Sequence, residues 1–191
     1  PVSVGAARLE DFPDGRTVHV SGNYAYVINF SKSLQVFDVS NPAKPVRVTS
    51  VKPAISGSWD VYVFGNYAFV RSLAPQGLEI FDISNPLQPV SVSSVKTDAG
   101  NYNLFVFGNY AYVINWLTST LQIFDVSNPS QPILVGRTKT SCKPTDIFVS
   151  DNYAYVITAY SPAGFGRNYR WPGNIQAFDV SDPAKPTLLN T

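Results

Sequence analysis

The sequence is poor in charge, and this shortage excludes several classes of partner. Charged residues make up 14% of the 191 residues, and the net charge is +1. An average soluble domain carries about 25% charged residues. So small a net charge gives no sign of a basic surface that could bind nucleic acid or an anionic membrane. We therefore expect no nucleic-acid partner. No apolar run reaches the length of about 18 residues that a membrane-spanning helix needs.

Cysteine and methionine are also scarce. The one cysteine, Cys142, cannot form a disulfide within the chain and cannot make a zinc site alone. We therefore expect no structural metal and no cofactor. The chain has no methionine and no signal peptide. Because it begins at Pro1, we expect it to be a processed product or a segment of something longer.

The sequence is instead rich in residues of strands and turns. Apolar residues make up 45%, and there are 11 tyrosines, 12 phenylalanines, 15 prolines and 12 glycines. Aromatic and β-branched residues favour strands, whereas Gly-Asn and Asn-Pro pairs favour turns. This composition predicts an all-β protein.

Two phrases recur along the chain in register. Gly22-Asn23-Tyr24-Ala25-Tyr26-Val27 has counterparts that begin 43 residues apart, at Gly65, Gly108 and Asp151. The second phrase, Phe37-Asp38-Val39-Ser40-Asn41-Pro42, recurs from Phe81, Phe124 and Phe178. The last copy carries about eleven extra residues before Phe178. A period of roughly 43 residues is typical of β-propeller blades.

Each copy predicts four short strands, which in the second copy are 45–52, 59–64, 67–72 and 78–83. The first alternates as an edge strand does, whereas the inner ones are apolar on both faces. Strands covered on both faces suit a propeller, in which each blade packs between two neighbours. We predict a β-propeller built from four four-stranded repeats of about 43 residues.

We expect residues 1–191 to form a single repeat domain. The predicted repeats are approximately 1–44, 45–88, 89–131 and 132–185, and residues 186–191 start a further strand. Residues 1–6 resemble the edge strand that opens the second repeat, and residues 186–191 resemble the start of the same strand. Both ends of the chain could therefore supply the same edge strand. The repeats form either a closed four-bladed ring or part of a larger propeller.

The phrases Ser33-Leu34-Gln35-Val36-Phe37-Asp38-Val39, Gly77-Leu78-Glu79-Ile80-Phe81-Asp82-Ile83 and Thr120-Leu121-Gln122-Ile123-Phe124-Asp125-Val126 resemble the LVIVD repeat. The Gly-Asn-Tyr-Ala-Tyr-Val phrases and the Ser-Asn-Pro exits are similar to it too. The fourth copy departs from the pattern, because Ala177 stands where the others have Val or Ile. The resemblance implies a β-propeller, an exported or cell-surface location and no catalytic residues.

Repeated polar residues are the first candidates for a site. Asp38, Asp82, Asp125 and Asp179 precede turns, and we expect them to set those turns. A second set opens the predicted innermost strands at one mouth of the channel: Thr17, Asp60, Asn103 and Asp146. Oxygen-rich rings hold cations, but we favour a role in satisfying backbone donors. His19 aligns with Tyr62, Phe105 and Phe148, which predicts a packing residue.

Tryptophans and one insertion are the candidates for binding. Trp59 opens an innermost strand and is expected in the core, whereas Trp116 lies in a predicted loop. The insertion at 159–174 combines aromatic residues with arginine, the types enriched at binding hot spots, and its candidates are Tyr160, Phe165, Arg167, Tyr169, Arg170 and Trp171.

We predict a non-catalytic structural or protein-interaction module, with a protein or neighbouring subunit as its partner. The alternative is a propeller that binds glycans or small ligands. An enzyme with a site at the channel mouth is the weakest prediction, because only Asp60 and Asp146 could serve it.

Overall fold

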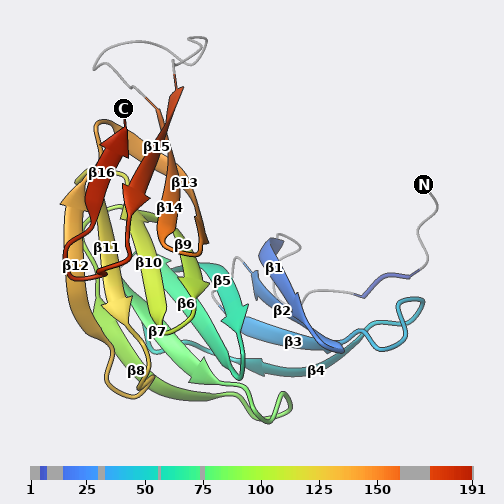
Figure 1. Cartoon of the computed structure of the whole chain (residues 1–191). Coiled ribbons are helices and arrows are strands. Elements are labelled where there is room, and N and C mark those ends of the chain that lie inside the picture. Colours follow the sequence, from blue (N-terminus) through green and yellow to red (C-terminus); the bar gives the residue numbers. More distant parts are fainter. Residues whose placement is uncertain are drawn as a thin grey trace. The chain divides into compact units, whose positions relative to one another are not determined.

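The computed structural model describes residues 5–7, 15–29, 33–55, 57–73, 76–159 and 173–190. Every regular element in these ranges is a β-strand, and the strands form four antiparallel sheets of four strands each (Figure 1). The chain divides into two compact units, residues 1–96 and 97–191, with two sheets in each. The all-β class and the four-stranded repeat are thereby confirmed.

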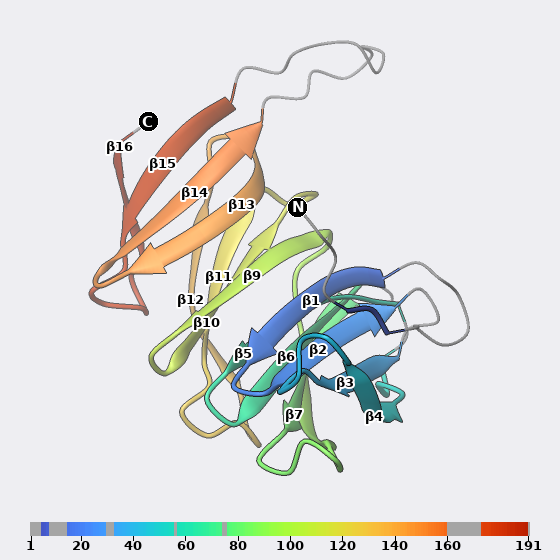
Figure 2. The same ribbon diagram turned by 90° about the vertical axis from the view of Figure 1, so that its right-hand side faces the viewer.

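The first unit holds sheets 1 and 2. Sheet 1 consists of β1 (Gly15–Ser21), β2 (Tyr24–Asn29), β3 (Leu34–Asp38) and β4 (Val46–Val51). Sheet 2 consists of β5 (Ser58–Phe64), β6 (Tyr67–Leu73), β7 (Gln76–Asp82) and β8 (Val90–Lys96). In both sheets the strands pair in the order of the chain, as the blue strands of sheet 1 show in Figure 2.

The second unit repeats this plan in sheets 3 and 4. Sheet 3 consists of β9 (Asn101–Phe107), β10 (Tyr110–Asn115), β11 (Thr120–Asp125) and β12 (Ile133–Lys139). Sheet 4 consists of β13 (Lys143–Ser150), β14 (Tyr153–Ala159), β15 (Gly173–Asp179) and β16 (Thr187–Asn190).

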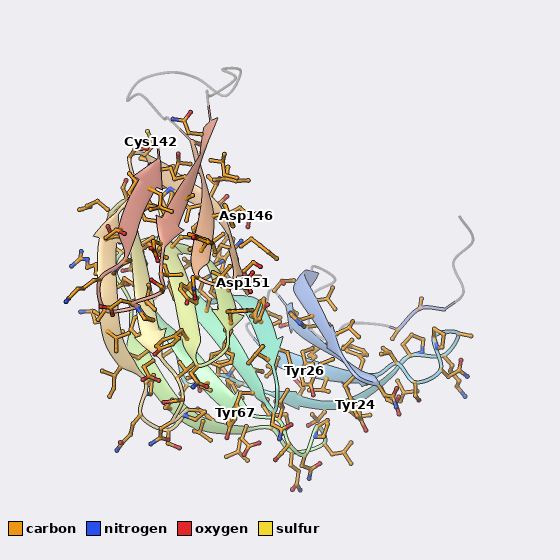
Figure 3. The ribbon with its side chains drawn as sticks, viewed as in Figure 1. Tyr24, Tyr26, Tyr67, Cys142, Asp146 and Asp151 are labelled. Atoms are coloured by element: carbon orange, nitrogen blue, oxygen red, sulfur yellow. The ribbon has the colours of Figure 1, made fainter. Side chains whose placement is uncertain are left out.

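The first two strands of each sheet are joined by the predicted tight turn. Gly22, Gly65 and Gly108 take positive φ angles of 56°, 57° and 57° at the same place in this turn. A residue without a Cβ adopts this conformation without steric cost. In sheet 4 the position is held by Asp151, which adopts a φ of 52° (Figure 3). The fourth turn therefore keeps the geometry although it lacks the glycine.

The sheets have the predicted period, but they start at a different place from the predicted repeats. The edge strand that was expected to open the second repeat is β4, which pairs with β3 and closes sheet 1. The reason is the Ser-Asn-Pro turn, which folds β4 back onto β3 as an antiparallel hairpin, with Lys44 N–H donating to Asn41 O at 2.9 Å. Likewise β16, in the tail 186–191, is the fourth strand of sheet 4.

Each sheet has two apolar faces. The Tyr face carries the middle aromatic residue of the second strand and the residue two positions later, which is Ile in sheets 1, 3 and 4 and Arg71 in sheet 2. In sheet 1 this face includes Tyr26, Ile28, Leu34 and Val36, and in sheet 3 Tyr112, Ile114, Leu121 and Ile123. The Val face carries the Ala and Val on either side of this aromatic residue; in sheet 2 it includes Val61, Val63, Ala68 and Val70, and in sheet 4 Ile147, Val149, Ala154 and Val156. Within each unit, the core forms where the Tyr face of one sheet packs on the Val face of the next.

Among the described residues, the structure contains no helix of the length and apolarity that would span a membrane.

Candidate functional site

The four repeated aspartates set turns, as the sequence predicts. Each carboxylate accepts a hydrogen bond from the backbone N–H two residues later, at 2.8 Å for Asp38, Asp82 and Asp125 and at 2.9 Å for Asp179. Hydrogen bonds from the hydroxyl and the backbone N–H of Ser127 lower the pKa of Asp125 below its ordinary value. The serine that follows each of the other three lowers its pKa in the same way. These carboxylates are held as ionised acceptors for the turn.

The predicted channel-mouth residues lie where the first strand of each sheet is irregular. The strand register shifts immediately before Thr17, Asp60, Asn103 and Asp146. In three of the four, the side-chain oxygen accepts the N–H of the next residue, at 2.9 Å for Asp60, 2.7 Å for Asn103 and 2.9 Å for Asp146. A bulge interrupts the ladder locally, so these oxygens satisfy backbone donors, which is the role that we favour.

Two of these residues also bond to each other. In the second unit, Asn103 Nδ2 donates to Asp146 Oδ1 at 2.8 Å, which links β9 to β13; Figure 3 labels Asp146 on β13. In the first unit, Asp60 Oδ2 lies 4.0 Å from Nε of the buried Arg71. A common ring of all four residues stays a prediction. Among the described residues, no group of three His, Cys, Asp or Glu side chains could hold a metal ion.

His19 packs as predicted, whereas Trp59 does not. The His19 ring lies edge-on to Tyr62, with 4.8 Å between ring centroids. Burial lowers the pKa of His19, and the weaker influence of Asp60 raises it. The expectation that Trp59 is a core residue is wrong, since 40% of it is exposed. Trp59 is the extra residue of the bulge between Ser58 and Asp60, and the extra residue of a bulge can turn outward.

Trp116 lies in the tight connection between β10 and β11, as predicted for a loop tryptophan. It is half-buried, and Lys143 Nζ lies over its indole at 3.7 Å from the ring centroid. Next to it, Leu117 is 61% exposed. Leu117 contacts Gly100, whose φ is 71° and where an added Cβ would lie within 3 Å of Leu117 atoms. The connection therefore presents one aromatic and one aliphatic side chain together.

Neighbouring strands fix the path of this connection. Trp116 N–H donates to Gly100 O at 2.6 Å, and Thr140 N–H donates to Ser119 O at 3.0 Å. Lys139 Nζ donates to Thr118 O at 2.9 Å. Ser119 adopts a φ of 50°, an uncommon conformation for a residue with a Cβ. Three of the four residues between the strands are thus held by hydrogen bonds, namely Trp116, Thr118 and Ser119.

The surroundings of the loop are mostly cationic. Asp98 accepts from Thr120 Oγ1 at 2.9 Å and from Arg137 Nη2 at 2.8 Å. Lys139 and Lys143 add two further positive charges beside the loop. We name the set Trp116, Leu117, Arg137, Lys139 and Lys143 the Trp116 surface. Because only Asp98 offsets its three cations among the contacts described, the surface has a positive bias that complements an acidic ligand.

The predicted binding residues of the insertion lie outside the described residues. They are Tyr160, Phe165, Arg167, Tyr169, Arg170 and Trp171. Their role in binding therefore stays a prediction.

A third repeated set escaped the sequence analysis. The middle of each third strand carries a buried Gln or Glu, namely Gln35, Glu79, Gln122 and Gln176. Three of them accept backbone N–H groups from the loop that precedes their own sheet. Glu79 accepts from Ala54 and Ile55, both at 3.1 Å, Gln122 accepts from Asp98 at 2.8 Å, and Gln176 accepts from Ser141 at 3.1 Å.

The signal for this set is present in the sequence. A polar residue recurs at one position inside an otherwise apolar strand, and a buried polar group in that setting is expected to have a partner. The spacing to the partner could not be inferred, because the loop lies 24 or 25 residues before Glu79 and Gln122 but 35 residues before Gln176, and it carries no motif of its own. Glu79, Gln122 and Gln176 belong to the construction of the sheets, since their side-chain oxygens accept backbone N–H groups.

The comparison with protein families identifies the chain. The model of the LVIVD repeat matches residues 14–52, 57–97, 100–140 and 143–159, which is more than half of the sequence. The chain therefore belongs to the LVIVD repeat family. No curated protein gives a significant match.

Solved structures show the same fold at low sequence identity. A Bacteroides uniformis protein provisionally named a 6-phosphogluconolactonase is 16% identical with a TM-score of 0.72, covering 98% of this chain and 57% of its own. The N-terminal domain of Nup159 is 11% identical with a TM-score of 0.63, covering 95% and 49%. The computationally designed Ika4 protein is 13% identical with a TM-score of 0.64, covering 92% and 98%.

These likenesses identify the sheets as the blades of a β-propeller. The chain spans about half the length of the first solved structures that it matches.

Proposed function

We propose that this chain is a non-catalytic protein-interaction module of an exported or cell-surface protein, and that it recognises its partner through the Trp116 surface. The observation that carries the proposal is the hydrogen-bonded loop that holds Trp116 and Leu117 beside three cationic side chains. Apolar side chains on a pre-organised loop lose little conformational entropy on binding.

The roles of the acidic side chains and of the histidine favour a binding function over catalysis. The repeated aspartates accept turn N–H groups, and Asp60 and Asp146 accept N–H groups at bulges. His19 packs against Tyr62. Each group thus has a structural partner that leaves it poorly placed as a general acid or base.

The composition of the Trp116 surface indicates the chemistry of the partner. Leu117 and the indole offer apolar contact, whereas Arg137, Lys139 and Lys143 favour carboxylates. We therefore expect an acidic protein segment that contains one apolar or aromatic side chain. Lys143 already lies over the indole, and a sugar ring would need to compete with it; this favours a protein over a glycan.

Selection from a random peptide display library on the immobilised 191-residue chain tests the proposal. Acidic peptides with an aromatic or aliphatic residue should be enriched, and Trp116→Ala and Leu117→Ser should each weaken their binding by about tenfold or more. Added salt should weaken binding too, since exposed charges are screened.

The matched control is Leu87→Ser, which removes a similarly exposed leucine from a turn between β7 and β8. Peptides that bind all variants equally, or a selection that enriches only neutral sequences, would show that the Trp116 surface is not the recognition site. A glycan array that gives Trp116-dependent binding would replace the proposal with the glycan alternative.

A further inference from the structure

The Tyr face of sheet 4 is exposed, unlike its counterparts in the same repeat. Phe148 is 58% exposed, Tyr155 39% and Ile157 47%. The equivalent residues of sheet 3 are Phe105, Tyr112 and Ile114, which belong to or pack on the core of the second unit. Ile175 on the adjoining β15 is exposed as well. These side chains form a continuous apolar patch across three neighbouring strands, and such patches mark interaction sites.

The Val face of sheet 1 is exposed along its first strand. Val18 and Val20 are 61% and 57% exposed, whereas their equivalents in sheet 2, Val61 and Val63, are 3% and 5% exposed. The corresponding residues of β9 and β13 are buried too. Among the described residues, sheet 4 thus exposes its Tyr face and sheet 1 exposes the first strand of its Val face, while Ala25 and Phe37 on the same Val face are buried. A Tyr face and a Val face are the two halves of the contact that each core contains.

We propose that the Tyr face of sheet 4 packs on the Val face of sheet 1 of a second copy of this chain. The occupant is defined by the cores of the two units, since in each of them a Tyr face is covered by the Val face of the next sheet. Because each copy brings one face of each kind, two copies can cover both faces of both chains. This is a head-to-tail contact, and such a contact forms a closed ring when the rotation between neighbouring copies brings the last copy back to the first.

The repeat also fixes the register of the contact. Aligned aromatic residues of consecutive first strands meet edge-on, His19 with Tyr62 at 4.8 Å and Phe105 with Phe148 at 5.0 Å between centroids. If sheet 1 of the second copy follows sheet 4 with the same spacing, Phe148 of one copy meets His19 of the second. Phe148, at the end of this series, has only the one aromatic neighbour described.

The proposed contact also defines a place for the outermost strand of each sheet, beside the turn of the next sheet. In the second unit, β12 passes the turn of sheet 4, so that a Cβ on Gly136 would meet the carbonyl of Pro183. In the first unit, Gly5 lies in the same relation to the carbonyls of Pro42 and Ala43. Residues 5–7 therefore occupy the place beside sheet 1 that β16 of the second copy takes in the proposed contact, and the association displaces them.

The first experiment measures the mass of the chain in solution by sedimentation across a range of concentrations. We expect a reversible assembly with at least twice the mass of one chain. Ile157→Lys and Val20→Lys each place a charge in the buried contact and should weaken the association at least about 100-fold. Ile133→Lys, at another exposed position on the outer strand β12, is the matched control and should leave the association unchanged.

Mixing variants tests the head-to-tail direction. The Ile157→Lys chain retains its Val face and the Val20→Lys chain retains its Tyr face, so the mixture should restore one contact and form heterodimers. A contact between two like faces predicts no rescue. Circular dichroism of each variant confirms that it remains folded, and both positions are exposed in the single chain.

Cross-linking separates this contact from closure within one chain. In a Cys142→Ser background, a His19→Cys chain mixed with a Phe148→Cys chain should form a disulfide of doubled mass, and neither chain alone should do so. The double variant His19→Cys/Phe148→Cys should also link between chains. A chain that stays monomeric, or a double variant that links only within itself, overturns the proposal. Deletion of residues 1–7 should tighten the association, and a loss of association on this deletion would equally contradict it.

Discussion

Sheets 3 and 4 share a strand sequence but differ in what covers it. Tyr110 to Ile114 and Tyr153 to Ile157 both spell Tyr-Ala-Tyr-Val-Ile. In β10 the second tyrosine and the isoleucine are buried, whereas in β14 both are exposed. Burial, followed by the influence of Tyr110, raises the pKa of Tyr112 to about 12. The same five residues thus form the same strand in both sheets, but only a neighbouring sheet turns their Tyr face into core.

The strongest expected difference concerns the two isoleucines of this shared strand. Ile114→Ala removes a fully buried side chain from the core of the second unit and should lower the free energy of unfolding by about 2–5 kcal/mol. Ile157→Ala should change it by less than about 1 kcal/mol, because the side chain is exposed. Urea unfolding at a concentration where the chain is monomeric measures both. Equal losses would contradict the assignment of covered and uncovered faces.

The buried glutamines should behave alike in the two sheets. Gln122 and Gln176 accept N–H groups from the preceding loops, and replacing either with Ala leaves a donor without its partner. We expect a loss of about 1–3 kcal/mol in each case, measured by the same unfolding experiment. Gln122→Glu and Gln176→Glu are the controls, since Glu79 holds the same position in sheet 2 and keeps the acceptor. A much smaller loss at Gln176 would mean that sheet 4 is built less tightly than sheet 3.

The turns of the two sheets differ by one residue that can be exchanged. Asp151 holds a φ of 52° where sheet 3 has Gly108 at 57°. Asp151→Gly should raise the free energy of unfolding by up to about 1 kcal/mol, because glycine has no Cβ to oppose this conformation. Gly108→Asp should lower it by a similar amount, and space for the side chain is open there. Thermal melts of both variants check the expectation. A less stable Asp151→Gly variant or a more stable Gly108→Asp variant would show that the backbone angle is not the cause.

The smallest effect, and one common to both sheets, concerns acid. The turn hydrogen bonds lower the pKa of Asp125 and Asp179 below the ordinary value of 3.8. Their contribution to stability is therefore fully present above that value and is lost as the pH falls through the lower pKa of the folded state. Melting temperatures between neutral pH and pH of about 2 should fall less for Asp125→Asn/Asp179→Asn than for the unaltered chain. An unchanged pH dependence would exclude these carboxylates as a source of it.

The sequence predicted the positions of the strands and turns better than the pairing of strands and the burial of side chains. The recurring Gly-Asn and Ser-Asn-Pro phrases located the turns, because turn geometry depends on residues that are adjacent in the chain. The predicted second repeat began with the edge strand β4, whereas β4 pairs with β3 and closes sheet 1. This pairing depends on how the β3–β4 hairpin closes, and the period alone does not determine it. The exposure of Trp59 depends on a bulge, and that of Tyr155 depends on a neighbouring sheet. No local pattern encodes either of them.

The candidate site was predicted only in part. Trp116 was placed in its loop from the repeat, but its partner Lys143 lies 27 residues later in another sheet. The buried Gln and Glu residues were visible as a repeated polar position, although the acceptor role of Glu79, Gln122 and Gln176 depends on loops 24 to 35 residues upstream. Contacts of this kind follow from the packing of sheets, which periodicity alone does not supply.

The reach of the third-strand Gln and Glu residues has a consequence for how the chain folds during synthesis. Every backbone pairing of sheet 2 lies between Ser58 and Lys96, so closing the sheet brings together only near positions in the chain. Short separations carry a low entropic cost and favour fast folding. Ala54 and Ile55, however, must wait for Glu79 to emerge before their N–H groups find their acceptor. Sheet 2 should therefore form as it leaves the ribosome, and Glu79 in its third strand should then bind the loop that connects it to sheet 1.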